Sequence, residues 1–436
     1  MQDFLNKSIQ SILGKYIGSF VTAFYSIFLI NLLGKDAYGA YTVSFLIPSI
    51  ITAIGSFGLG PSIIYHINKL KVDTLSFFRL VFLFATIISL IYVVIFNYFN
   101  GAIIKYVNNP IFIDKQIVLI SSLTIPSLLY RKYIRAFLRG FYKIKETVFV
   151  ESILSPIFML LGVLVLSLKD YSLHFFIVLP IITNVFAFSV MMFFLRKSLF
   201  ISKGALKKFK MKDFKKIILF AIKGHLGTIF QKVNFELILL ILTPSIKLGE
   251  IGTLSLAIKI LNIFRGFIDA FINALAPKVS KSKLDQVIII IPRLTRFLSF
   301  YLILLWPFLW FTLPIITPVL YGNEFSNMDL YFKILIPGVT TISLTNIFLL
   351  SLTFTGNPKY KTYARLLGFI FSLLFLISFK DQLGIVAGLI SISGGYLISA
   401  FYSIYSVRKV HKVTISDLVF LKIEDYKYLR KSIKKN

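Results

Sequence analysis

Twelve apolar stretches divide the sequence, and each is long enough to cross a bilayer as a helix, for which about 20 residues are needed. They occupy residues 9–33, 40–66, 76–99, 116–139, 147–168, 173–195, 217–243, 251–276, 293–320, 330–355, 361–379 and 383–407. Only 15% of the 436 residues are charged, too few to cover the water-exposed surface of soluble domains. We therefore predict an all-α integral membrane protein with about twelve transmembrane helices.

The positive charges are concentrated in every second connection between these stretches. Of 48 Lys and Arg residues, 37 fall in segments 1–16, 66–80, 131–145, 196–216, 278–296, 357–365 and 408–436, whereas the alternate connections hold 7. The positive-inside rule then places both termini in the cytoplasm of a multi-pass protein of the cell (inner) membrane. We expect these loops to contact anionic lipids of the inner leaflet. This distribution accounts for most of the net charge of +30, so nucleic acid is not an expected partner.

Short patterns recur about half a chain apart, which indicates an internal repeat. The first pair is Leu33-Gly34-Lys35 with Gly39 and Leu248-Gly249-Glu250 with Gly252; the second is Gly140 with Lys143 and Gly356 with Lys359. We predict two pseudo-symmetric six-helix halves, 1–200 and 217–407, around a central cavity, as in alternating-access transporters. A basic linker, 201–216, would join them. The basic tail 408–436 is expected either as an amphipathic helix on the inner leaflet or as a frayed end.

Several charged residues lie within the predicted seventh and eighth spans, where each costs roughly 2.5–3.5 kcal/mol unless it faces a cavity or a partner. The seventh span carries Lys223, His225, Lys232 and Glu236, and the eighth carries Lys259, Asn262, Arg265 and Asp269. Four positive charges against two negative ones leave +2, which favours an anionic ligand. The alternative is that Lys232 with Glu236, and Arg265 with Asp269, merely neutralise each other as i,i+4 pairs.

Three arginines follow one another at helical spacing near the predicted cytoplasmic end of the fourth span. Arg131, Arg135 and Arg139 lie one turn apart. Guanidinium groups bind phosphate with forked donors, so this cluster is a candidate cytoplasmic mouth of a binding site. The alternative is anchoring of the helix end to lipid headgroups. Glu151, early in the fifth span, is expected to pair with the cluster.

Other function classes are disfavoured by what the sequence lacks. The chain has no cysteine and four scattered histidines, so we predict no metal centre and no cofactor. It contains no GxxxxGK[ST] pattern for ATP. A polymerase or ligase of lipid-linked sugars would use a large external loop and paired carboxylates, and the sequence predicts neither. The protein is therefore expected to be a transporter and not an enzyme.

The chain resembles the polysaccharide (O-antigen-type) flippases of the multidrug/oligosaccharidyl-lipid/polysaccharide exporter superfamily. The resemblance rests on the segments 33–41, 223–227, 318–325 and 356–359. Family members often carry Asn-aromatic-Arg-Leu-Asp in the seventh span. Here residues 234–238 read Asn-Phe-Glu-Leu-Ile, so the family's ion-coupling pattern is not preserved.

The resemblance implies translocation of undecaprenyl-diphosphate-linked sugar repeat units from the inner to the outer leaflet, beside a polysaccharide polymerase machinery. On this basis, we expect Lys223, Lys232, Lys259, Arg265 and Asn262 to hold the diphosphate and sugar, and Arg131, Arg135 and Arg139 to gather the headgroup. Glu236, Asp269 and His225 are candidates for coupling to Na⁺ or H⁺. A multidrug exporter of the same superfamily is the second hypothesis, disfavoured by the positive charge, and a membrane-embedded polymerase or ligase is the third.

Overall fold

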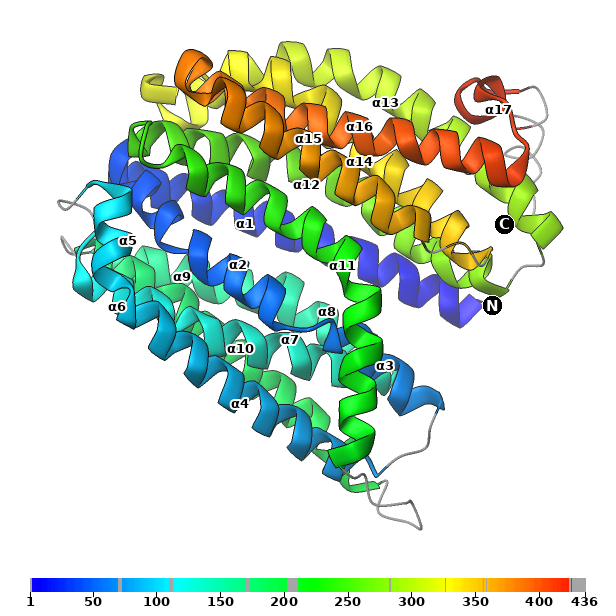
Figure 1. The fold of residues 1–436 in the computed structure, drawn as a ribbon, viewed down its shortest axis with the longest axis horizontal. Coiled ribbons are helices and arrows are strands. Elements are labelled where there is room, and N and C mark those ends of the chain that lie inside the picture. The colour runs from blue at the N-terminus through cyan, green and yellow to red at the C-terminus, as the bar shows by residue number, and fades with distance from the viewer. Residues whose placement is uncertain are drawn as a thin grey trace. The chain divides into compact units, whose positions relative to one another are not determined.

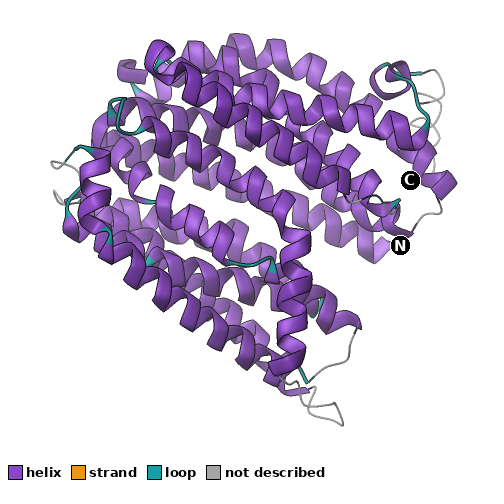
Figure 2. Cartoon of the chain, in the orientation of Figure 1, coloured by secondary structure: helices purple, strands orange, loops and turns teal. Residues whose placement is uncertain are grey.

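The protein is described by a computed structural model in which every regular element of the described residues is a helix (Figure 2). The described residues are 2–69, 73–109, 113–168, 172–201, 211–281, 284–325, 327–355, 357, 359–422 and 425. Nine helical stretches among them are long and apolar enough to cross a membrane, and the first, Ile17–Ile64, covers two predicted spans. The prediction of an all-α membrane protein is confirmed.

The chain divides into two compact units, Met1–Leu256 and Ala257–Asn436. The helices of the first unit are α1 (Gln2–Ser44), α2 (Leu46–Gly55), α3 (Leu59–Lys69), α4 (Thr74–Tyr98), α5 (Asn100–Val107), α6 (Lys115–Ser122), α7 (Thr124–Gly140), α8 (Ile144–Phe149), the π-helix η1 (Val150–Leu154), α9 (Ser155–Leu166), α10 (Leu173–Ile201), α11 (Met211–Leu242) and the start of α12 (Leu248–Lys281). The second unit holds the rest of α12, then α13 (Leu284–Tyr321), η2 (Asn323–Phe325), α14 (Met328–Phe354), α15 (Lys359–Leu383), α16 (Ile385–His411) and α17 (Ile415–Val419) (Figure 1).

The first unit thus contains α11, which the sequence repeat assigns to the second half. The predicted boundary at 201–216 falls mostly outside the described residues and stays a prediction.

The predicted second span is not one continuous helix. It begins in α1 after Gly34, whose φ of 74° interrupts that helix, and continues through α2 and α3. Between α2 and α3, Phe57 and Gly58 have φ of 46° and 68°, a left-handed conformation that ends an α-helix. The chain therefore exposes the C-terminal end of α2 partway through a membrane-spanning segment. Broken helices of this kind are tolerated where the freed backbone finds protein partners.

Helix α7 lies in the core of the first unit and packs against α3, α4 and α10. Its buried Phe137 contacts the rings of Phe77 and Phe78 on α4, with centroids 5.6 and 5.1 Å apart. Leu129, Tyr133 and Ile134 belong to the same buried cluster. This packing fixes the orientation of α7 and with it the face that carries its charges.

The two segments related by the predicted repeat are in direct contact within the first unit. The backbone N–H of Gly249 donates to Asp36 Oδ1 at 3.0 Å, and Lys35 Nζ lies 3.7 Å from Glu250 Oε1. A Cβ atom at Gly39 would lie 1.9 Å from the carbonyl oxygen of Leu248, so only glycine permits this approach. Asp36 also places a negative charge at the N-terminus of α12, where the helix dipole favours it.

The second unit is built around α14 and α16, which pack against each other and against α13 and α15. Its buried cluster includes Phe348 and Leu352 of α14, Val407 of α16 and Leu418 of α17. The outer side of α13 is strongly apolar, with Phe311 73% and Val319 81% exposed. Such a surface is typical of a helix that faces lipid.

Candidate anion-binding site

Four basic residues lie along α7, the central helix of the first unit: Arg131, Lys132, Arg135 and Arg139. Arg131, Lys132 and Arg135 are half-buried, whereas Arg139 is exposed at the end of the helix. Arg139 forms no ion pair with any described residue. The structure therefore separates the arginine stripe predicted from the sequence into two half-buried members, Arg131 and Arg135, and one exposed member, Arg139.

Arg131 is fixed by neutral and charged partners on three elements. Its terminal nitrogens donate to Asn184 Oδ1 of α10 at 2.7 Å and to Ser155 Oγ of α9 at 3.3 Å. Its Nε lies 3.6 Å from Glu151 Oε1. Asn184 in turn donates to Ser127 Oγ at 3.3 Å. This network leaves Arg131 little freedom to bind anything else.

Arg135 has one partner only among the described residues, Glu151. A single terminal nitrogen of Arg135 donates to both carboxylate oxygens, at 2.9 and 3.0 Å, which confirms the expected pairing with Glu151. The Arg135 side chain is 33% exposed and Glu151 is 16% exposed. The remaining donors of Arg135 are therefore available to a ligand.

Glu151 lies in η1, a single π-helical turn between α8 and α9. Turns of this type widen a helix by one residue and are frequent at functional sites. Here the Ser155 hydroxyl donates to the carbonyl oxygen of Val150 at 2.7 Å. The turn thereby brings Glu151 and Ser155 to the same arginine pair.

The side chain of Lys132, on α7, contacts the helix break between α2 and α3. Its ammonium donates to the hydroxyl of Ser56, the residue that follows the last residue of α2, and Tyr133 Oη donates to the Ser56 carbonyl oxygen at 3.2 Å. A cation is favoured at a helix C-terminus by the exposed carbonyls and the helix dipole. Lys132 is not among the site residues predicted from the sequence. Its i,i+3 spacing from Arg135 was the available signal.

Helix α11 contributes Lys232 and Glu236, which the sequence predicts on one face. Glu236 Oε1 accepts a hydrogen bond from Ser49 Oγ of α2 at 3.2 Å, while Oε2 is buried without a hydrogen-bond partner among the described residues. Lys232 is exposed and forms no ion pair within 4.0 Å in the described part of the chain, so the neutralising pair with Glu236, the alternative interpretation of the sequence, is not formed. Lys232 does lie close enough to Lys132 and Arg135 for their charges to repel one another.

The charges of this region do not balance. Arg131, Lys132, Arg135, Arg139 and Lys232 supply five positive charges, and Glu151 and Glu236 supply two negative ones, which leaves +3. Like charges held together in a partly desolvated region favour binding of an anion. Besides Arg139 at the end of the helix, Lys132, Arg135 and Lys232 retain free donors; these three residues are here called the cationic triad.

The other predicted site residues either belong to the second unit or have side chains outside the described residues. Lys259 is exposed on α12, and Asn262 and Arg265 are half-buried there. The Asn262 side-chain oxygen is buried with no hydrogen-bond partner among the described residues. The side chains of Lys223, His225 and Asp269 are outside the described residues, so their predicted roles stay predictions.

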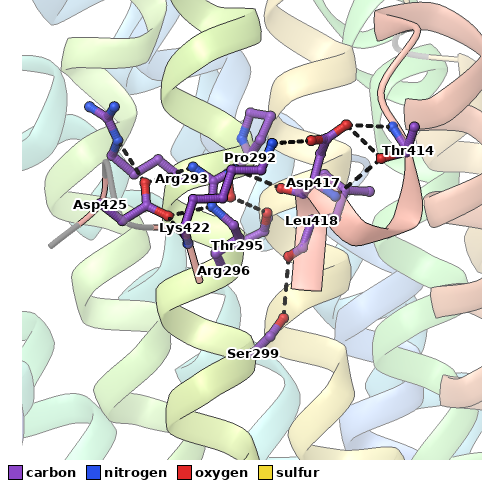
Figure 3. A network of polar contacts seen from close by, with 10 residues as sticks. All are labelled: Pro292, Arg293, Thr295, Arg296, Ser299, Thr414, Asp417, Leu418, Lys422 and Asp425. Carbon is purple, nitrogen blue, oxygen red and sulfur yellow. Dashed lines mark hydrogen bonds and ion pairs between the residues drawn. The ribbon is translucent and has the colours of Figure 1, made fainter. Parts of the chain in front are cut away.

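A second arginine pair closes the predicted cytoplasmic end of α13 and was not found from the sequence (Figure 3). Arg296 donates from Nε and one terminal nitrogen to the two oxygens of Asp425, both at 2.6 Å, and from the other to the Asp417 carbonyl at 2.8 Å. Arg293 Nε lies 3.1 Å from Asp425. Thr414 and Asp417 form a capping box at the start of α17. These contacts, here called the tail clasp, fix the segment after α16 to α13.

A family model described as "Polysaccharide biosynthesis protein" matches residues 28–329, more than half of the chain. The chain belongs to this family. No curated protein sequence matches it. The member described here is a multi-pass membrane protein.

Several solved structures share this fold. The lipid II flippase MurJ in an inward closed conformation is 16% identical with a TM-score of 0.64, over 95% of this chain and 89% of that one. The MATE multidrug transporter DinF-BH is 13% identical with a TM-score of 0.66, over 96% of both chains. A MOP superfamily transporter from Pyrococcus furiosus, described as having a binding pocket of reverse polarity, is 12% identical with a TM-score of 0.64, over 94% of this chain and 96% of that one. At these identities the similarity establishes the fold and leaves the ligand open.

Proposed function

We propose that this protein flips undecaprenyl-diphosphate-linked oligosaccharides, the repeat units of a polysaccharide, from the inner to the outer leaflet by alternating access. The observation that carries the proposal is the cationic triad of the first unit, with the net charge of +3 around it. A diphosphate is the anionic group common to such substrates. The family's association with polysaccharide biosynthesis supports the same substrate class.

The triad supplies complementary donors for a diphosphate. Arg135 offers the fork of a guanidinium, which matches two phosphate oxygens, while Lys132 and Lys232 act as point charges. Lys223 of α11, and Lys259, Asn262 and Arg265 of α12, stay predicted ligands of the diphosphate and sugar. Arg139 remains the candidate for first contact with the headgroup at the cytoplasmic mouth, beside anionic lipids of the inner leaflet. The polyprenyl chain stays in the bilayer.

The helix break between α2 and α3 and the carboxylate of Glu236 supply candidates for the conformational change and for ion coupling. The break between α2 and α3 gives a place where one half of a helix bends relative to the other, as alternating access requires. Glu236, with one buried oxygen free, is a candidate for coupling to H⁺ or Na⁺, together with His225 and Asp269. The protein acts as a transporter without a cofactor, and we expect it to work beside a polysaccharide polymerase.

A multidrug exporter is the alternative on this fold. Cationic drugs would meet repulsion from Lys132, Arg135 and Lys232, and among the described residues of this region Glu151 and Glu236 supply the opposing charge. The charge therefore favours the anionic substrate.

Ligand-dependent thermal stability of the purified protein separates the two. A ligand that binds only the folded state raises the melting temperature once its concentration exceeds Kd. We expect stabilisation by undecaprenyl-diphosphate-linked sugar, weaker stabilisation by undecaprenyl phosphate and none by a cationic dye. The double variant Lys132→Ala/Lys232→Ala should lose the effect while retaining its insertion, and Lys259→Ala/Arg265→Ala tests the second unit in the same way.

The control is Lys333→Ala, which removes an exposed positive charge at the start of α14. It should leave lipid binding unchanged. Stabilisation by dyes alone, or by the diphosphate lipid equally in the wild type and both double variants, would contradict the proposal.

A further inference from the structure

We propose that Glu151 is an exchangeable internal anion: it occupies Arg135 when the site is empty and is displaced by the substrate's diphosphate, which then takes over Arg135. This inference rests on the proposed function and adds to it the group that sets affinity and release. The contact on which it depends is the pairing of one Arg135 nitrogen with both oxygens of Glu151 at 2.9 and 3.0 Å.

The two arginines that share Glu151 are not equivalent, and the difference shows which one exchanges. Arg131 donates to Asn184 and Ser155 as well as lying 3.6 Å from Glu151, so it keeps two neutral partners if the carboxylate moves. Arg135 has Glu151 as its one partner among the described residues and is a third exposed. Arg131 therefore positions Glu151, whereas Arg135 is the donor that changes partners.

The surroundings ensure that Arg135 pairs with some anion at every stage. Lys132 and Lys232 are near enough to repel its charge, so loss of Glu151 with no replacement is unfavourable. A diphosphate carries more negative charge than one carboxylate and relieves the repulsion at all three cations. Binding is then an exchange of anions, and the return of Glu151 to Arg135 promotes substrate release.

The local backbone suits a carboxylate that changes position. Glu151 is carried by the π-helical turn η1, where the regular i to i−4 hydrogen-bond pattern is interrupted. The turn is backed by α1, since a Cβ atom at Gly18 would lie 2.0 Å from the carbonyl oxygen of Ser152. Glu151 thus lies on a π-helical turn that packs against α1, and its side chain points to Arg131 and Arg135.

An internal competitor has a signature that a purely structural ion pair lacks: its removal tightens ligand binding. We expect Glu151→Gln to bind undecaprenyl diphosphate roughly tenfold more tightly than the wild type, a coupling of ordinary size between two linked equilibria. The same tightening should appear with inorganic pyrophosphate, because the exchange involves only the diphosphate group. Release should slow, so turnover in proteoliposomes falls while Kd falls with it.

Glu146→Gln is the matched control. Glu146 lies five residues earlier in α8, is half-buried and forms no ion pair among the described residues, so its removal changes the net charge equally. Its Kd for both probes should stay within about twofold of the wild type. Glu151→Asp provides a second variant that keeps the charge but is one methylene shorter, and an intermediate Kd is expected from it.

The outcomes separate the two proposals. If the wild type binds both probes but Glu151→Gln binds them equally or more weakly, Glu151 is not an exchangeable anion, and the proposed function stands. If Glu151→Gln tightens binding of the lipid but not of pyrophosphate, the effect lies outside the diphosphate and the exchange is also refuted. If the wild type binds neither probe, the proposed function fails and the exchange fails with it. Should Glu151→Gln fold poorly, an unchanged Kd in Glu151→Asp contradicts the exchange by itself.

Discussion

The two units each contain two arginines one turn apart on a helix that share a single carboxylate. In the first unit Arg131 and Arg135 share Glu151; in the second Arg293 and Arg296 share Asp425. The tail clasp is closed, because Asp425 is 1% and Arg296 7% exposed. The pair on α7 is open, because Arg135 is 33% exposed and has unused donors.

The surroundings of an arginine–carboxylate group, and not its composition, therefore decide whether it is structural or exchangeable. In the tail clasp, hydrogen bonds from Arg296 outweigh burial and lower the pKa of Asp425 to about 2. The Asp425 carboxylate is thus charged and paired with Arg296 at any physiological pH. In the first unit, Lys132 and Lys232 add positive charge that one glutamate does not balance. Binding of an additional anion is therefore favoured in the first unit. In the tail clasp, the buried carboxylate of Asp425 already occupies Arg296.

The largest expected effect is on the tail clasp. Asp425→Asn leaves Arg296 buried without a counter-charge, and removal of one partner of a buried pair typically costs about 3–5 kcal/mol. The melting temperature of the purified protein should fall accordingly. Asp381→Asn, which removes a 76% exposed partner of Lys380, should cost less than about 1 kcal/mol. Equal effects of the two substitutions would show that the clasp is not closed.

The next prediction separates Arg131 from Arg135. Arg131→Met removes hydrogen bonds to Asn184 and Ser155 and should lower stability by about 2–3 kcal/mol. Arg135→Met should cost less than about 1 kcal/mol, because its side chain is partly exposed and Glu151 keeps Arg131 nearby. Binding of undecaprenyl diphosphate should show the opposite order, with Arg135→Met the weaker binder. The same order in stability and binding would remove the distinction between a positioning and an exchanging arginine.

The pH dependence of the clasp gives a somewhat smaller effect. The pKa of Asp425 is lowered from 3.8 in the unfolded chain to about 2 in the folded protein, so its contribution is full above pH 4 and is lost as the pH falls through 2. This shift corresponds to about 2 kcal/mol. The difference in melting temperature between the wild type and Asp425→Asn should stay constant from pH 8 to 5 and narrow below pH 4. A difference that widens on acidification would contradict the assignment.

The smallest expected effect on stability is that of an exposed ion pair, which serves as a reference for the buried ones. Lys333 and Asp329 form an i,i+4 pair on α14 with side chains 42% and 40% exposed. Asp329→Asn should change stability by less than about 0.5 kcal/mol, since solvent and salt screen such pairs. A loss of 2 kcal/mol in the melting experiment would mean that exposure does not separate structural from weak pairs in this protein.

The membrane fold was predictable from the sequence, because apolar length and the alternation of basic loops are local properties. The pairing of Glu151 with Arg131 and Arg135 was also predictable, since both segments lie near the same predicted membrane surface. Lys132 was missed because its partner, Ser56, sits at a helix break whose glycines and proline mark a bend but not its contacts. The tail clasp was missed because Arg296 and Asp425 are 129 residues apart in the sequence and no periodicity relates them.

The neutralising pair of Lys232 with Glu236 is the instructive case among the alternatives. Helical spacing permits it, yet Glu236 accepts from Ser49 of another helix and Lys232 stays exposed. Spacing along one helix defines which side chains share a face, whereas packing of neighbouring helices decides their partners.

Leaflet exchange in proteoliposomes measures whether the cationic triad moves a diphosphate lipid across the bilayer. A labelled undecaprenyl-diphosphate sugar is placed in one leaflet, and its appearance in the other is followed for the wild type, for Lys132→Ala/Lys232→Ala and for protein-free vesicles. We expect rapid exchange with the wild type and a rate near that of protein-free vesicles for the double variant, with equal amounts of inserted protein. Exchange by the double variant at the wild-type rate would refute this role of the triad.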